Sequence, residues 1–162
     1  MVEKRWKVVL TSMLIFILVG LVLANILRKD QDKTFENNYI EYNQLVEAYS
    51  AGDINSAFLI GTNLLKKIPS SEQVNYVTGL AALDGSDYNM AAVLLQKTLD
   101  LNPHKVEDPI FMINFGEALF YSGKLSEAQI VLMRCKDSGW MPENYPDYQN
   151  RVSELLDLII GQ

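Results

Sequence analysis

The stretch Asp87–Pro103, DYNMAAVLLQKTLDLNP, is typical of a single capped helix, and it is the most informative segment for the fold. Asp87 stands where an N-cap is expected, and Pro103 ends the helix shortly after its last apolar side chain. The intervening positions that share one helical face recur at spacings of three or four residues: Ala91, Leu94, Leu95, Thr98 and Leu99. The small side chain of Ala91 lets a neighbouring helix approach closely. We therefore expect other helices to pack against the helix over residues 87–103.

The same pattern occurs 34 residues earlier in the chain. Pro69 precedes Pro103 by that distance, and Ala57 precedes Ala91 by the same distance. A 34-residue period built from two helices and a turn resembles the tetratricopeptide repeat (TPR) family. The best copy runs over residues 72–103. The preceding copy has Leu45 where the family prefers Gly, and a third copy, displaced by three residues, contains Gly116, Gly123 and Ala128.

The resemblance implies an all-α fold, and no segment alternates with the period of two that a strand requires. We expect an N-terminal transmembrane helix followed by a short α-solenoid of about three TPR-like helix pairs plus a C-terminal capping helix. The linker is either a short coil or a continuation of the first helix. The expected parts are a basic tail over 1–7, the transmembrane helix over 8–27, a linker over 28–37, repeats over 38–142 (38–71, 72–105 and 109–142), and the capping helix over 143–162.

Residues 8–27, VVLTSMLIFILVGLVLANIL, carry no charge. As a helix they would extend about 30 Å, the thickness of a bilayer's hydrocarbon core. A permanent single-span anchor is favoured. A cleaved signal peptide, for which residues 22–24 supply small side chains, and a buried helix remain alternatives. We expect a cytoplasmic N-terminus and a repeat domain outside the cytoplasm, preferably at a bacterial inner or plasma membrane.

The net charge of −6 is unevenly distributed. Residues 1–29 contain five basic residues and one acidic residue, whereas residues 30–162 contain nine basic and nineteen acidic residues, a net charge of −10. Because such a domain repels phosphate backbones, nucleic acid is not an expected partner. The single cysteine, Cys135, excludes an intramolecular disulfide and is expected in the core.

In arrays that resemble this one, the first helix of each pair lines a concave face. The corresponding side chains form an aromatic and aliphatic groove for an extended or helical segment of a partner protein. Alternatively, these side chains pack on one another or on the final helix. The groove residues are Tyr39, Tyr42, Val46, Tyr49, Tyr76, Leu80, Leu83, Ile113, Glu117, Phe120 and Tyr121.

Some members of the family hold a partner's C-terminal carboxylate with Lys, Arg and Asn side chains on this face. The corresponding positions here lack the basic members, so the resemblance does not extend to such a clamp. These positions are Tyr42, Val46, Val77, Ile110 and Asn114.

No catalytic, metal-binding or cofactor-binding residues are identifiable. The only histidine, His104, lies near Glu107 and Asp108, and we expect a solvated loop there rather than a metal site. The sequence has no nucleophile with a base at a usable spacing and no phosphate-binding Gly-rich loop. We therefore expect neither an enzyme nor a small-molecule substrate.

These features favour a membrane-anchored TPR-type protein–protein interaction module. It would be an assembly factor, scaffold or holding chaperone whose partners are membrane or exported proteins. The alternative is a permanent accessory or structural subunit of a larger membrane protein complex.

Overall fold

The computed structural model describes the backbone of residues 2–161, and it describes side chains except those of residues 1–5, 7–12, 22–31 and 162. Within the described part the chain forms helices joined mostly by short turns, with a longer connection over residues 138–147 and no strand. The chain divides into two compact units, Met1–Ile40 and Glu41–Gln162. The all-helical prediction is therefore confirmed for the described residues.

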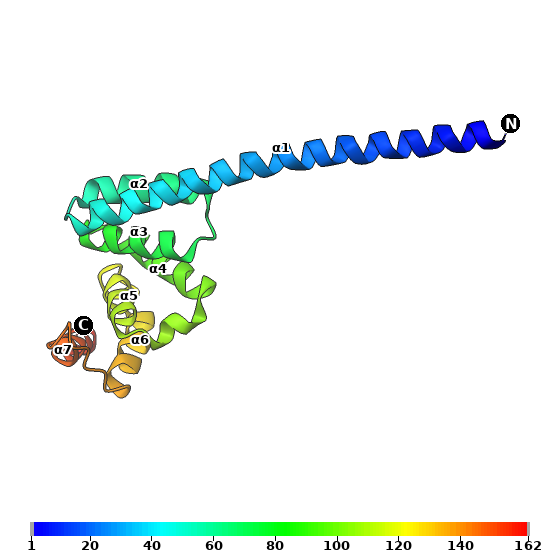
Figure 1. Cartoon of the computed structure of the whole chain (residues 1–162). Coiled ribbons are helices and arrows are strands. Elements are labelled where there is room, and N and C mark those ends of the chain that lie inside the picture. Colours follow the sequence, from blue (N-terminus) through cyan, green and yellow to red (C-terminus); the bar gives the residue numbers. More distant parts are fainter. Residues whose placement is uncertain (1, 162) are drawn as a thin grey trace. The chain divides into compact units, whose positions relative to one another are not determined.

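The first element is one helix, α1 (Val2–Ser50), drawn as an unbroken coil in Figure 1. Its backbone continues through the linker expected at 28–37, so the continuous alternative is the observed one. No Gly or Pro occurs between residues 21 and 51, and nothing in that sequence therefore terminates the helix before Gly52.

The prediction of a transmembrane helix over residues 8–27 is wrong. Among the described residues, no helix is long and apolar enough to cross a membrane. In that segment, side chains are described only for the nine residues 13–21, and residues 8–12 and 22–27 lie outside the described side chains. Nine residues rise about 14 Å along a helix, less than half of the hydrocarbon core. The predicted single-pass membrane localisation is corrected for the same reason.

The second unit adds six α-helices and one 3-10 helix to the last turns of α1. Asp53, Ser71, Asp87 and Asp108 each accept a backbone N–H bond at the start of a helix, which explains why these helices begin where they do. The helices are α2 (Ile54–Lys67), α3 (Glu72–Asp84), α4 (Tyr88–Leu101), η1 (Pro103–Glu107), α5 (Pro109–Tyr121), α6 (Leu125–Asp137) and α7 (Tyr148–Ile160).

The segment expected as a loop between Asn102 and Asp108 is instead the 3-10 helix η1. Asn102 caps it by accepting the N–H of His104, and Pro103 fits its first position because proline needs no N–H partner there. The three residues that displace the last repeat from the 34-residue period are accommodated in this turn, so they do not break the stacking.

The helices of the second unit form two rows. From α2 onward each helix contacts the next along the chain, and α3 contacts α5 while α5 contacts α7. By contrast α2, α4 and α6, all fully described, make no comparable contacts with one another. We call residues 41–50 of α1 together with α3, α5 and α7 the inner row, and α2, α4 and α6 the outer row. This alternation is a helical repeat fold.

Small side chains fill the crossings between helices, as the sequence predicts. Ala57, Ala91 and Ala128 are fully buried at equivalent positions in the three outer-row helices. The final helix α7 closes the array by burying Tyr148 and Val152 in the same core as Phe111 of α5. The predicted capping helix is therefore present, beginning at Tyr148.

The closest crossing between helices, where Gly61 of α2 meets Thr78 of α3, is predicted to tolerate no added methyl group. A Cβ at Gly61 would lie 2.9 Å from the Cβ of Thr78, a rigid β-branched side chain of α3. We expect Gly61→Ala to lower the free energy of unfolding by about 1–3 kcal/mol through overpacking, measured by urea denaturation followed by circular dichroism.

Gly20→Ala is the matched control, because nothing lies within 4 Å of the added Cβ. Thr78→Ala should partly rescue Gly61→Ala, since it removes the two nearest atoms. An unchanged unfolding midpoint for Gly61→Ala would contradict the observed crossing of α2 and α3.

Candidate functional site: the inner-row surface

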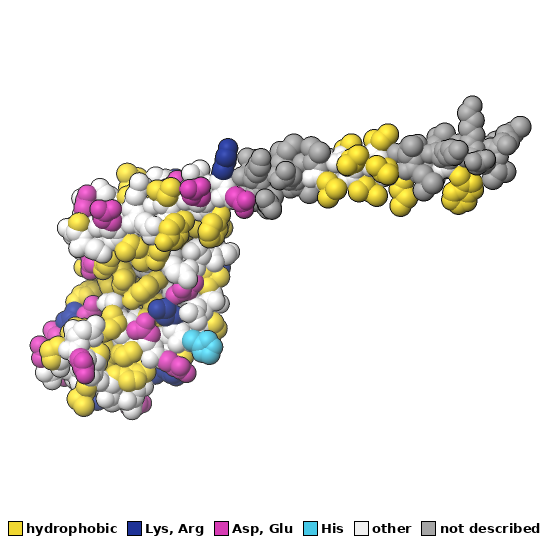
Figure 2. Space-filling view, viewed as in Figure 1, with side chains coloured by type: hydrophobic (Ala, Val, Ile, Leu, Met, Phe, Trp, Pro, Cys, Tyr) yellow, Lys and Arg dark blue, Asp and Glu magenta, His cyan; other side chains and the backbone are white. Residues whose placement is uncertain are grey.

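The first half of the inner row presents apolar side chains that are only partly buried. Those on α1 and α3 are defined here as the inner-row surface: Tyr42, Val46, Tyr49, Tyr76, Leu80 and Leu83. Figure 2 shows apolar side chains gathered between the helices of the second unit. The remaining predicted residue of this half, Tyr39, is 59% exposed and belongs to the first unit.

The second half of the inner row is partly covered by the final helix, although Tyr121 stays 42% exposed. Ile113 is only 1% exposed and belongs to the core, so it cannot line a surface groove. Phe120 packs against that core, and Glu117 and Tyr121 are engaged by the final helix. For this part of the predicted groove, the alternative of packing on the final helix is the observed arrangement.

Arg151 of α7 makes the contacts that hold the final helix against this half. Its Nε donates to Glu117 Oε1 at 2.6 Å, its Nη2 to the Tyr121 hydroxyl at 2.8 Å, and its Nη1 to Glu154 Oε2 at 3.0 Å. Burial lowers the pKa of Arg151, but these three hydrogen bonds outweigh burial and hold the pKa above its usual range. The Tyr121 ring also stacks on Tyr88 of α4, with ring centroids 4.9 Å apart.

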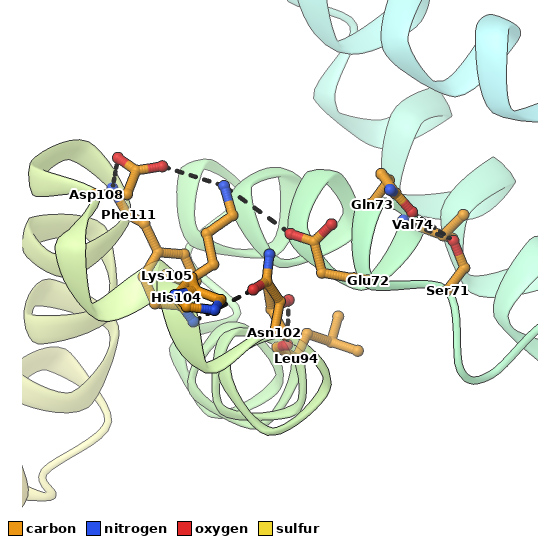
Figure 3. A network of polar contacts seen from close by, with 11 residues as sticks. Ser71, Glu72, Gln73, Val74, Leu94, Asn102, His104, Lys105, Asp108 and Phe111 are labelled. Atoms are coloured by element: carbon orange, nitrogen blue, oxygen red, sulfur yellow. Dashed lines mark hydrogen bonds and ion pairs between the residues drawn. The ribbon is translucent and has the colours of Figure 1, made fainter.

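Lys105 of η1 fixes α3 against α5, as Figure 3 shows. Its Nζ lies 3.1 Å from Asp108 Oδ2 and 3.9 Å from Glu72 Oε1. The same ammonium group lies 4.6 Å from the centroid of the Tyr76 ring, within cation–π range. The Tyr76 ring in turn contacts Phe111 of α5, with centroids 5.7 Å apart. Tyr76 therefore supports the junction between two repeats as well as facing the surface.

Tyr49 and Asp84 join the ends of α1 and α3. The Tyr49 hydroxyl donates to Asp84 Oδ2 at 2.9 Å. Burial, together with the Asp84 carboxylate, raises the pKa of Tyr49, so the phenol stays protonated and keeps donating. In the described part of the chain no cation pairs with Asp84, so its negative charge remains at the edge of the inner-row surface.

The structure reveals a second apolar row that the sequence reasoning missed. Leu59, Val93 and Ile130 are 62%, 56% and 71% exposed on α2, α4 and α6. They are spaced by 34 and 37 residues, the same spacing as the buried alanines two positions before them. The spacing of these three residues was the sequence signal that could have predicted the second apolar row. A shallow cleft of about 280 Å³ lies beside Val93, between α4 and α6.

The residues weighed for metal or redox chemistry do not form a cluster. Within the described residues, no three His, Cys, Asp or Glu side chains gather as a metal site. His104 is exposed on η1, and Cys135 is buried in α6. Burial raises the pKa of the Cys135 thiol, which disfavours the reactive thiolate form.

No family model matches the chain, and no curated protein sequence matches it. Solved structures do match. The type III secretion translocator chaperone SycD of Yersinia enterocolitica is 18% identical with a TM-score of 0.58, over 77% of this chain and 92% of SycD. SycD in complex with a peptide of the translocator YopD matches with a TM-score of 0.58 and 18% identity, over 74% of this chain and 89% of that chain.

A K341M mutant of the Thermobaculum terrenum O-GlcNAc transferase is 21% identical with a TM-score of 0.54. The match covers 76% of this chain but only 22% of that enzyme chain. At these identities the likenesses establish the fold alone, which is a helical repeat.

The Arg151 contacts are predicted to stabilise the end of the array. Arg151→Met keeps most of the aliphatic stem but leaves the partly buried Glu117 carboxylate without its partner. We expect a loss of about 1–3 kcal/mol in the free energy of unfolding, because a hydrogen bond to a charged group is removed. Glu154→Gln is the control, since Glu154 is 59% exposed and its pairing contributes little. A double-mutant cycle with Glu117→Gln should yield a coupling energy, and zero coupling would contradict this role.

From the raised pKa of Tyr76 we expect the protein to lose stability at alkaline pH. Burial, and then the Asp108 and Glu72 carboxylates, raise the pKa of Tyr76 to about 12. Because an unfolded tyrosine ionises near pH 10, stability from this residue is complete below about pH 10 and is lost as the pH rises towards 12. Tyr76→Phe should flatten the fall in unfolding free energy over that interval. A fall identical to that of the parent protein would contradict the pKa assignment.

Proposed function

We propose that this chain captures a segment of another protein on its inner-row surface, as a scaffold, assembly factor or holding chaperone. In this proposal it has no catalytic activity, and its helix pairs are repeats of the tetratricopeptide type. The observation that carries the proposal is the contrast between the two halves of the inner row. In one half α7 binds Glu117 and Tyr121, whereas Val46 and Leu80 of the other half are partly exposed and pack against neither buried cluster.

Val46 and Leu80 are the most informative side chains of the open half. Both are apolar and partly exposed, and among the described residues neither belongs to a buried cluster or packs against one. Tyr42 and Tyr49 flank them with rings that can bury area while their hydroxyl groups remain satisfied. Such a surface suits an extended or helical peptide segment with apolar anchors.

Two further observations support the proposal. Small residues recur at the tetratricopeptide spacing and are buried at the crossings, which supports the repeat type. SycD, which shares the fold, has been solved with a peptide of its translocator YopD. That structure supports peptide capture as a use of the fold, and the partner of the present chain is a separate question.

A permanent structural subunit of a larger protein complex is the second candidate. The observation that favours it is the outer row of exposed aliphatic side chains at Leu59, Val93 and Ile130. A lasting contact along α2, α4 and α6 would bury these side chains, whereas capture on the inner-row surface leaves them exposed.

Site-specific photocrosslinking separates the two candidates. A photoreactive amino acid replaces Leu80 of α3 in one variant and Val93 of α4 in the matched variant, and both are expressed in the native host. We expect a discrete adduct from position 80 and none from position 93, with Val46→Ser weakening the adduct. An adduct from position 93 alone would support the structural-subunit candidate and overturn the capture proposal. Unchanged circular dichroism confirms that each variant folds.

A further inference from the structure

We propose that the captured segment is basic, carrying Lys or Arg side chains beside its apolar anchors. This inference rests on the proposed function and adds the chemical class of the partner. It is carried by the way the charges of the second unit are divided between its two helical rows.

The inner row is strongly acidic. Residues 41–50 of α1 with α3, α5 and α7 contain one base, Arg151, against seven acids, a net charge of −6. The outer-row helices α2, α4 and α6 contain five bases against three acids, a net charge of +2. Residues 30–162 together carry a net charge of −10, so an even distribution of charge would have made both rows negative.

Cations offset this charge only in part: Lys67 of α2 pairs with Glu41, whereas Lys105 and Arg151 are each shared by two carboxylates. Lys105 pairs with Glu72 and Asp108, and Arg151 pairs with Glu117 and Glu154. Each group of three therefore retains one negative charge. Asp84 adds another, since it accepts the Tyr49 hydroxyl and has no cation as a partner in the described part.

The helix dipoles add negative potential in the same row. A helix C-terminus carries a partial negative charge that a nearby Lys or Arg normally offsets. The last turns of α3, α5 and α7 contain no basic residue. Of the outer-row helices, α2 has Lys66 with Lys67 and α6 has Arg134 with Lys136 in the last turn, whereas α4 has none. Asp84 even places a carboxylate in the last turn of α3, where a cation from a partner would relieve both charges.

These charges select the occupant. Leu80 and Asp84 lie one helical turn apart on α3, so an apolar anchor and a cation one turn apart on a bound helix would meet them together. Charge complementarity also speeds association and rejects partners of the wrong sign. A second copy of this acidic chain or an acidic segment would be repelled.

The test is a selection of displayed random peptides against the full chain. The peptides are about sixteen residues long, enough for four helical turns. We expect enriched sequences with apolar residues at helical spacing and a net positive charge. Their binding should weaken when salt is raised from about 50 to about 500 mM, because exposed charges are then screened.

Variants locate the binding on the surface. Asp84→Asn should weaken a selected peptide by roughly two- to fivefold, as expected for an exposed ion pair. Leu80→Ala should weaken it as well. Asp100→Asn removes the same charge from the outer-row helix α4 and is the matched control, with no expected effect. Circular dichroism of each variant reports retained folding.

The failures are distinguishable. Enrichment of neutral or acidic peptides whose binding is lost in Leu80→Ala overturns the charge inference and leaves the proposed function standing. Basic peptides that lose binding in Leu80→Ala but bind equally to Asp84→Asn and the parent protein, at low and high salt, also overturn the inference and leave the proposed function standing. If no enriched peptide depends on Leu80, the proposed function itself fails.

Discussion

The stacking of this domain depends on residue pairs at the crossings between helices. In each pair a glycine on one helix faces a leucine on the next. A Cβ at Gly79 would lie 3.1 Å from Leu95, and a Cβ at Gly116 would lie 2.6 Å from Leu132. In both pairs the leucine follows the glycine by sixteen residues, on the next helix of the chain. The two backbones can approach closely because the leucine occupies the space that the glycine leaves free.

The first repeat reverses this pairing. Leu45 stands on the inner row where the later repeats have glycine, and Gly61 follows it by sixteen residues where they have leucine. Leu45 is fully buried, so its extra volume is accommodated. Gly61 instead lets α2 approach Thr78 of α3, moving the closest contact from within a helix pair to the junction with the next pair. Taken alone, Leu45 looks like a departure from the repeat pattern. Leu45 and Gly61 together exchange the large and the small residue between the two helices of the pair, and the fold is retained.

Two cations then determine how much of the inner row stays open. Lys105 holds α3 against α5 through two carboxylates and the Tyr76 ring, which fixes the relation between the second and third repeats. Arg151 holds α7 on α5 and closes the third repeat. Both contacts use acids of the inner row, yet both leave that row negative. The same interactions therefore shape the open surface and set its charge.

Local structure could be predicted from the sequence: the cap at Asp87, the repeat spacing, and the buried alanines at the crossings. These follow from each helix's own periodicity and end chemistry. Apolar composition alone predicted a transmembrane helix wrongly. Which of the predicted groove residues stay exposed depends on how the helices pack together. Leu80 and Glu117 hold equivalent repeat positions, 37 residues apart, yet Leu80 is partly exposed and packs against neither buried cluster, while Glu117 is bound by Arg151. The physical reason is that burial depends on the neighbouring element, and a repeat pattern does not state where the final helix packs.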